Sequence, residues 1–337
     1  MKTEKFYLKD RCADIAAVGD ILKNGGIVAI PTETVYGLAA SAYSDSAIEK
    51  VFLAKGRPQD NPLIVHISDM EMLKDVAADI PEVAYKLAEK FWPGPLTMVL
   101  GKGDKVCESV SRGLNTVAVR MPSHKTALEI IKTAGLPLAA PSANTSGYPS
   151  PTSASHVLHD LDGKIGGVVM DENCEVGVES PVVSLVGNTP RLLRPGAVTL
   201  EQLREILPDI CMDSAVLTEV KKGEKVSSPG MKYKHYSPKT KVFLVEGSNK
   251  AFTDYVNQTR NSAAICFLED LGIKIPFTVY GTAENPATLA HNVFEALRDI
   301  DDKGYNAVYV HAPEKTGVGL AVYNRLIRAA AFKVITL

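Results

Sequence analysis

The sequence predicts an α/β protein of two domains, each built from strands that alternate with helices. Three observations support this prediction. The chain has 337 residues, more than one hydrophobic core usually holds together; extended and helical patterns alternate along most of it; and its composition changes over residues 221–239. We place a first domain at residues 1–205, a linker at 206–239 and a second domain at 240–337.

In the first domain, short apolar runs predict strands at 27–30, 63–67, 96–100, 116–120, 138–140, 168–170, 182–186 and 191–194. Helical spacing predicts helices at 13–23, 46–54, 83–90, 125–134, 153–158 and 200–207. Asp45 and Ser123 lie at the start of two of these helices, and we expect them to be N-caps. Prolines at the strand ends predict short, rigid loops at the sheet edges, where sites are commonly built.

Residues 221–239 contain six lysines and one glutamate around a Ser-Ser-Pro-Gly stretch, which predicts a linker. The alternation then resumes. Expected strands lie at 242–245, 263–267, 277–280 and 307–310, and expected helices at 250–259, 286–300 and 320–331. This pattern favours a small, doubly wound α/β domain.

The composition excludes several classes of protein. Thirty-seven basic and 39 acidic residues give a net charge of −2, so any contact with RNA must be local or weak. The five cysteines form no Cys-x-x-Cys pair, which favours reduced thiols over a disulfide framework or a zinc site. Residues 1–10 lack the apolar segment of a secretory signal, and no run of about 18 apolar residues occurs. We therefore expect a cytoplasmic protein that does not contact membranes.

The first candidate segment for chemistry is PTETVYGL at residues 31–38, directly after a predicted strand. Ligands of α/β proteins lie beyond the carboxyl ends of strands, and Thr34 with its neighbours supplies hydroxyls, a carboxylate and a phenol there. A plain turn is the alternative interpretation.

The second segment runs from KGRP at residues 55–58 to NPLIVHI at residues 61–67. Lys55 and Arg57 on a Gly-Pro loop suit a polyphosphate, because Arg offers a planar fork of donors and Lys a compact charge. His66, at the end of a strand, would face the same cleft. A solvated basic loop and a core histidine are the alternatives.

The third segment, AAPSANTSG at residues 139–147, consists of small residues whose backbone N–H groups and hydroxyls can approach an anion. Arg120 and Arg194 end two strands and would point to the same edge, unless they form surface salt bridges. The chain contains no Walker loop, dinucleotide fingerprint, nucleophile elbow or paired metal-ligand spacing. The reaction is therefore expected to depend on positioning and charge stabilisation.

Together these motifs resemble the threonylcarbamoyl-AMP synthase family, which is built on a YrdC-like domain. The matching segments are PTETVYGL, KGRP with NPLIVHI, FWPGPLTMVL, TVAVRMP, PLAAPSANTSG, GVESPVV and LRPG, and they cover most of residues 12–199. The linker segment SPGMKYKHYSP and the second domain resemble the long, two-domain branch. The resemblance implies a twisted mixed sheet surrounded by helices, followed by a smaller Rossmann-like α/β domain.

The resemblance also implies a reaction in which L-threonine, bicarbonate and ATP give L-threonylcarbamoyladenylate and pyrophosphate, for modification of tRNA next to the anticodon. Mg2+ would accompany ATP, no protein metal site is implied, and the product would pass to the tRNA threonylcarbamoyl-transfer machinery. Lys55 and Arg57 would be catalytic. L-Threonine would contact Thr34, His66, Arg120, Ala140 and Ser180, and the nucleotide would contact Arg57, Asn61, Thr116, Ser142, Ser150, Arg194 and Tyr236.

The linker is also expected to act as a lid, with its lysines, Tyr233, His235 and Tyr236 folding over the polyanion. Two departures from the family pattern affect this assignment: Pro181 and Ser184 stand where the family usually has Thr and Asp, so the role of Ser180 is less firmly implied. Residues 317–326, GVGLAVYNRL, resemble a second-domain signature, to which the sequence assigns no chemistry.

Two other functions are compatible with parts of the sequence. YrdC-like domains look able to hold double-stranded RNA, so a pure RNA-binding protein is one alternative. A carbamoyl transferase that acts on another acceptor is the second, although the acylphosphatase and zinc-finger modules expected of it do not occur in the chain.

Overall fold

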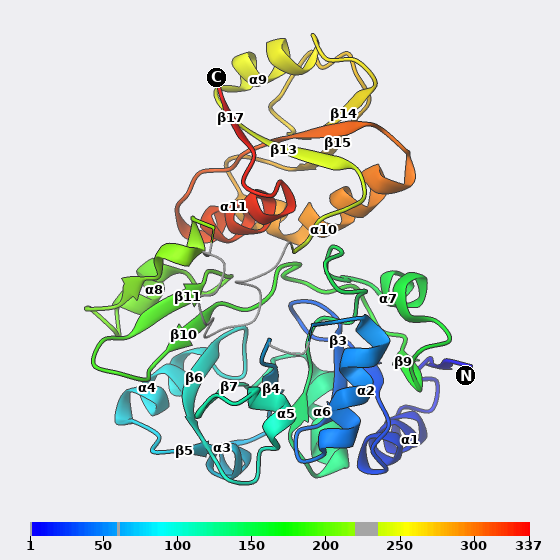
Figure 1. Cartoon of the computed structure of the whole chain (residues 1–337), viewed down its shortest axis with the longest axis vertical. Helices are drawn as coiled ribbons and strands as arrows, with labels where there is room; N and C mark the ends of the chain where they lie inside the picture. Colours follow the sequence, from blue (N-terminus) through cyan, green and yellow to red (C-terminus); the bar gives the residue numbers. More distant parts are fainter. Residues whose placement is uncertain (1, 59–60, 220–234) are drawn as a thin grey trace.

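The computed structural model describes residues 2–58, 61–219 and 235–337, so residues 220–234 of the predicted linker, including Tyr233, lie outside the described residues. Two sheets, one above the other in Figure 1, form the two domains. The predicted fold class is confirmed: the larger domain has a twisted mixed sheet with helices around it, and the smaller has a second sheet with helices on both faces.

The large sheet has 12 strands in the order β1-β9-β2-β3-β8-β4-β7-β6-β10-β11-β12, with β5 paired to β6. Their bounds are β1 (Glu4–Phe6), β2 (Val28–Ile30), β3 (Gly37–Ser41), β4 (Ile64–His66), β5 (Ala77–Ala78), β6 (Thr97–Lys102), β7 (Thr116–Arg120), β8 (Leu138–Ala139), β9 (Gly167–Val169), β10 (Val182–Ser184), β11 (Arg191–Arg194) and β12 (Cys211–Met212). All eight strands predicted for this domain are present. The prediction missed β3, because its sequence GLAAS lacks the β-branched and aromatic residues that mark strands.

Eight helices of the described residues surround this sheet: α1 (Arg11–Lys23), α2 (Asp45–Lys55), α3 (Met70–Val76), α4 (Glu82–Phe91), α5 (Glu108–Ser111), α6 (Lys125–Ala134), α7 (Ala154–Leu161) and α8 (Leu200–Arg204). Both predicted N-caps are wrong. Ser44 caps α2 by accepting from the Ala47 N–H at 3.2 Å, so Asp45 is already helical and its carboxylate accepts from the Ser109 N–H instead. His124 precedes α6 in place of Ser123 and makes no capping bond.

The second domain contains β13 (Lys241–Glu246), β14 (Ser262–Phe267), β15 (Phe277–Gly281), β16 (Ala307–His311) and β17 (Val334–Thr336). All are parallel, in the order β15-β14-β16-β13-β17. The helices are α9 (Asn249–Val256), α10 (Pro286–Asp302) and α11 (Gly317–Ala329). In Figure 1, α10 and α11 lie between this sheet and the first domain, whereas α9 covers the far face.

The two domains pack closely along α11. The large sheet continues past residue 205 to β12, which pairs with β11, so residues 211 and 212 belong to the first domain. Asn324 of α11 donates to the Val216 carbonyl at 2.6 Å, and Val35 and Val178 of the first domain join the apolar core of the second. The described part of α11 is buried almost throughout, which brings the second domain against the strand ends of the first.

Candidate active site

A cavity of about 750 Å³, counting its open mouth, lies where the strand ends of the first domain meet residues 235 and 236 of the linker. Its lining includes all but two of the predicted site residues: Thr34, Lys55, Arg57, His66, Arg120, Ala140, Ser142, Ser150, Ser180, Arg194 and Tyr236. Thr116 lines a separate, smaller pocket, and Asn61 is buried beside Pro62, which lines both pockets. The nucleotide contacts predicted for Asn61 and Thr116 stay predictions.

Neighbouring strands build one end of the cavity, which we call the β4/β7 cluster (Glu33, Thr34, His66 and Arg120). β4 and β7 are parallel and in register, so His66 lies beside Arg120. Nη1 of Arg120 donates to Thr34 Oγ1 at 2.8 Å, and Nη2 is 2.7 Å from Glu33 Oε1. The backbone fixes these positions because both strands are central in the sheet.

The charges of the β4/β7 cluster follow from its burial. Burial acts to raise the pKa of Glu33, but the Arg120 guanidinium outweighs it and holds that pKa below its usual value. Burial and the positive charge of Arg120 lower the pKa of His66 to about 3, so its imidazole is neutral at neutral pH. His66 Nδ1 is buried and has no hydrogen-bond partner among the described residues, which leaves it for a ligand.

The other end of the cavity is formed by the 142–150 loop, which Lys55 holds through hydrogen bonds. The sequence placed Lys55 on a loop, but the structure makes it the last residue of α2, ended by Gly56 at φ 59°. Its ammonium donates to the Ser142 and Asn144 carbonyls and to Asn144 Oδ1, three acceptors for three N–H groups. Burial and Arg57 hold the pKa of Lys55 well below its usual value.

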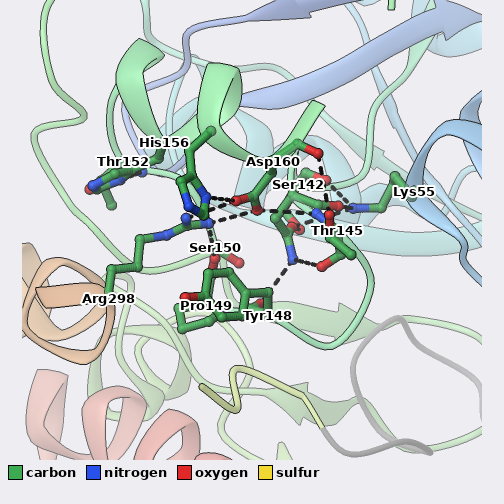
Figure 2. Close-up of polar contacts among 12 residues, drawn as sticks. Lys55, Ser142, Thr145, Tyr148, Pro149, Ser150, Thr152, His156, Asp160 and Arg298 are labelled. Carbon is green, nitrogen blue, oxygen red and sulfur yellow. Dashed lines mark hydrogen bonds and ion pairs between the residues drawn. The ribbon is translucent and has the colours of Figure 1, made fainter. Parts of the chain in front are cut away.

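The second domain supports the same loop from the other side, as Figure 2 shows. Arg298 of α10 donates to both carboxylate oxygens of Asp160, at 3.1 and 3.0 Å, and to the Pro149 carbonyl at 2.5 Å. Asp160 in turn accepts from the Thr145 N–H at 3.1 Å. The Tyr148 hydroxyl donates to Asp301 at 2.7 Å. Two helices from different domains therefore fix one loop.

A buried carboxylate, that of Glu179, lies in the wall between the two ends. Ser150 Oγ donates to Glu179 Oε1 at 2.5 Å, and Nε of Arg325 from α11 donates to Oε2 at 2.8 Å. Burial acts to raise the pKa of Glu179, but Arg325 and Arg194 lower it below its usual value. Next to it, Arg194 Nε donates to the Ser180 carbonyl at 2.9 Å, and Ser180 Oγ is 2.8 Å from Thr97 Oγ1.

His235 and Tyr236, the linker residues at which the described chain resumes, close one side of the cavity. Tyr236 adopts φ 59°, and its ring packs 5.2 Å from that of Phe294 in the second domain. The Ser237 N–H donates to the Gly147 carbonyl at 2.8 Å. The part of the predicted lid that is described therefore contacts the 142–150 loop. Residues 220–234, which are also predicted to belong to the lid, lie outside the described residues.

Sequence reasoning missed several residues of the site. Asn144 lies in the AAPSANTSG segment and Glu179 in GVESPVV, so the only available signal was a polar side chain within a candidate motif. Arg298 had no signal, and Arg325 had only its place in the 317–326 segment, because their partners lie 138 and 146 residues away and in another domain.

Comparisons with known proteins cover both domains. Residues 20–196 match the family model described as "Telomere recombination", and residues 198–331 match "Threonylcarbamoyl-AMP synthase, C-terminal domain". Two relatives named threonylcarbamoyl-AMP synthase are each 42% identical: the match covers 99% of this chain and 100% of the Bacillus subtilis protein, and 95% of both chains for the Pyrococcus abyssi protein. The crystal structure of P. abyssi Sua5 complexed with L-threonine has 38% identity and a TM-score of 0.90, covering 100% of this chain and 99% of that one.

Proposed function

The chain belongs to the threonylcarbamoyl-AMP synthase family, and from this premise we propose that it converts L-threonine, bicarbonate and ATP into L-threonylcarbamoyladenylate and pyrophosphate. The resemblance drawn from the motifs is thereby confirmed. The product is the activated intermediate for threonylcarbamoyladenosine modification of tRNA next to the anticodon. The observation that carries this function is that one cavity collects the arginines and hydroxyl groups of motifs lying far apart in the sequence.

L-Threonine is assigned to the β4/β7 cluster. The Arg120 guanidinium matches a carboxylate in shape and charge, and the neutral His66 offers a ring nitrogen without a partner among the described residues. Ala140 and Ser180, the remaining predicted threonine contacts, line the same cavity. A neutral imidazole here supplies a hydrogen bond without adding a charge.

ATP is assigned to the end formed by Arg57, Arg194 and the 142–150 loop. Bicarbonate and the threonine nitrogen form a carbamate with loss of water. The carbamate oxygen then attacks the α-phosphorus while the bond to the pyrophosphate leaving group breaks. This displacement requires aligned reactants and neutralised negative charge, which the arginines supply. The contacts of Lys55 favour a role in holding the loop carbonyls, so that the loop N–H groups and hydroxyls are in place.

Mg2+ is proposed to enter as part of the MgATP substrate. Among residues 2–58, 61–219 and 235–337, no group of three or more His, Cys, Asp or Glu side chains is arranged to hold a metal ion. Glu179, which lines the cavity, and Glu33 of the β4/β7 cluster are both paired with arginines. This donor set suits an ion carried by phosphates, as Mg2+ commonly is.

A cytoplasmic location and transfer of the product to the tRNA threonylcarbamoyl-transfer machinery complete the proposal. No helix in the described parts of the chain is long and apolar enough to cross a membrane. The net charge of −2 gives no support to RNA binding as the main function.

Pyrophosphate release tests the proposed function. Purified protein is incubated with ATP, Mg2+ and bicarbonate, with and without L-threonine, and Arg57→Ala serves as the site variant. We expect release that requires both threonine and bicarbonate and falls in the variant. Release that ignores threonine, or none at all, would leave a nucleotide or RNA binder as the better interpretation.

A further inference from the structure

Glu179 presents an electrostatic problem for a cavity that binds ATP. Its side chain is buried, it lines the cavity, and its oxygen accepts from Ser150, a predicted nucleotide contact. An uncompensated buried carboxylate at this place would repel the phosphates of the nucleotide, because charges interact strongly where water is excluded. Something must neutralise Glu179 without occupying the cavity.

Arg325 meets this requirement from the second domain. It is fully buried in α11, and its Nε donates to Glu179 Oε2 at 2.8 Å. Its other nitrogens donate to the Glu179 carbonyl, the Pro195 carbonyl and Asn324 Oδ1, each at 2.9 Å. Arg325 does not itself line the cavity. The guanidinium is therefore held behind the wall, with its charge directed at Glu179.

Arg194 is a second cation that acts on Glu179. It lines the cavity, is a predicted nucleotide contact, and precedes Pro195, whose carbonyl Arg325 holds. If Arg325 were absent, Glu179 would attract Arg194 and draw its charge away from the nucleotide. The pairing with Arg325 leaves Arg194 available on the cavity side.

We propose that Arg325 is a positioning residue for the nucleotide: by neutralising Glu179 from behind the cavity wall, it keeps Arg194 free to bind the phosphates of ATP. This inference rests on the proposed function and gives the second domain a part in it. It also assigns a role to the 317–326 segment, for which the sequence offered none.

The test measures ATP affinity by calorimetry in the full-length protein, without threonine. Arg325→Met should weaken ATP binding by about 10- to 100-fold, the range expected for losing one charged hydrogen-bond pair. Glu179→Gln in the same chain should restore most of the affinity, since the repelling charge is then gone. Arg325→Lys, which keeps the charge but loses most of the bonds, should fall between wild type and Arg325→Met.

The pH dependence separates this role from a purely structural one. The ATP affinity of Arg325→Met, relative to that of wild type, should fall as pH rises from about 5.5 to 8. Over this range Glu179 loses its proton, and in the variant no Arg325 guanidinium neutralises the resulting charge. Four other titratable groups interact electrostatically with Glu179, namely those of Lys55, Arg194, His235 and Tyr236. The pKa of His235 is lowered to about 3 by burial and Arg57, so it does not titrate in this range. In the double variant the dependence should disappear.

Arg298→Met is the matched control, since it also removes a buried interdomain arginine but leaves Glu179 paired. If Arg298→Met changes the ATP affinity, adding Glu179→Gln should not reverse that change. Equal ATP affinity in wild type and Arg325→Met, or an affinity loss that Glu179→Gln does not restore, would overturn this inference alone. Absence of ATP binding by wild type would overturn the proposed function, and this inference with it.

Discussion

The two ends of the cavity are built in different ways. The β4/β7 cluster belongs wholly to the first domain, and adjacent strands in register place His66 and Arg120 side by side. The 142–150 loop is tied to the sheet only at its start, where Ser142 forms a bridge with Gly37. Its carbonyl groups are also held by Lys55 from one side and by Arg298 from the other domain. The threonine end is thus fixed by a sheet, whereas the nucleotide end also depends on two charged side chains, of which Arg298 comes from the other domain.

This difference predicts which changes stay local. A defect in the β4/β7 cluster should impair threonine use and leave ATP binding intact. A change in the second domain should impair ATP binding and leave the β4/β7 cluster intact. Each experiment below either separates the two ends or shows that they are coupled.

Arg120→Met should have the largest effect, because it removes the proposed threonine ligand and leaves Glu33 buried without its ion-pair partner. We expect threonine-dependent pyrophosphate release to fall on the order of 100-fold. The free energy of unfolding should fall by about 3–5 kcal/mol, as for other broken buried pairs. ATP affinity, measured by calorimetry below the unfolding temperature, should change less than about 3-fold.

Glu33→Gln combined with Arg120→Met is the matched control for stability. It should recover much of the lost unfolding free energy, since no buried charge is left unpaired, but it should not recover threonine use. A loss of ATP affinity as large as the loss of threonine use would show that the sheet couples both ends.

The same contrast explains what the sequence could predict. The strands that carry His66 and Arg120 have β-branched and apolar residues in short runs, so their existence and their ends were predictable. The second-domain side chains were not, because ion pairs between Asp160 and Arg298, or Glu179 and Arg325, leave no local pattern. Their partners become neighbours only when α10 and α11 dock on the first domain.

The element ends show a similar limit. Whether Ser44 or Asp45 caps α2 is decided by which oxygen reaches the Ala47 N–H, and both residue types are good caps. Lys55 was expected beside Arg57 because they are two positions apart. Both side chains do line the cavity, but Gly56 ends the helix between them. Lys55 therefore holds the loop backbone, whereas the Arg57 guanidinium lies 6.0 Å from the centroid of the Phe52 ring.

A neutral His66 predicts a pH-dependent stability that originates at the threonine end. Its pKa is about 3 in the folded chain against an ordinary value of 6.5, so the unfolded chain takes up a proton first as pH falls. The contribution to stability is complete above pH 6.5 and is lost as pH falls toward 3. At pH 5 the loss should be about 2 kcal/mol relative to pH 7.5.

Urea unfolding of wild type and His66→Gln at these two pH values measures this effect. The difference in unfolding free energy between the two proteins should shift by that amount, in favour of the variant at the lower pH. Glu179 and Glu33 have lowered pKa values and therefore lose their contributions only in more acidic solution. Parallel pH dependences would mean that His66 is charged in the folded protein, which would remove the basis for a neutral contact with threonine.

Tyr148→Phe should have the smallest effect, although Tyr148 lines the cavity and its hydroxyl bonds the second domain. Asp301, which accepts that hydroxyl, also accepts from the Thr240 N–H at 2.8 Å and from Thr240 Oγ1 at 3.1 Å, so it stays hydrogen-bonded in the variant. The ring, with the Arg298 guanidinium 4.8 Å from its centroid, is retained. We expect a loss of about 0.5–1.5 kcal/mol in unfolding free energy and less than a 2-fold change in ATP affinity.

Tyr148→Ala, measured by the same urea titration and calorimetry, removes the ring as well and should cost more in both quantities, because the contact with Arg298 is then lost. If the phenylalanine variant alone weakened ATP binding 10-fold, a single hydroxyl would matter as much as a buried arginine. The nucleotide end would then depend more on the geometry of the 142–150 loop than on the charges of Lys55 and Arg298. The two ends of the cavity would differ only in how rigidly their backbones are held.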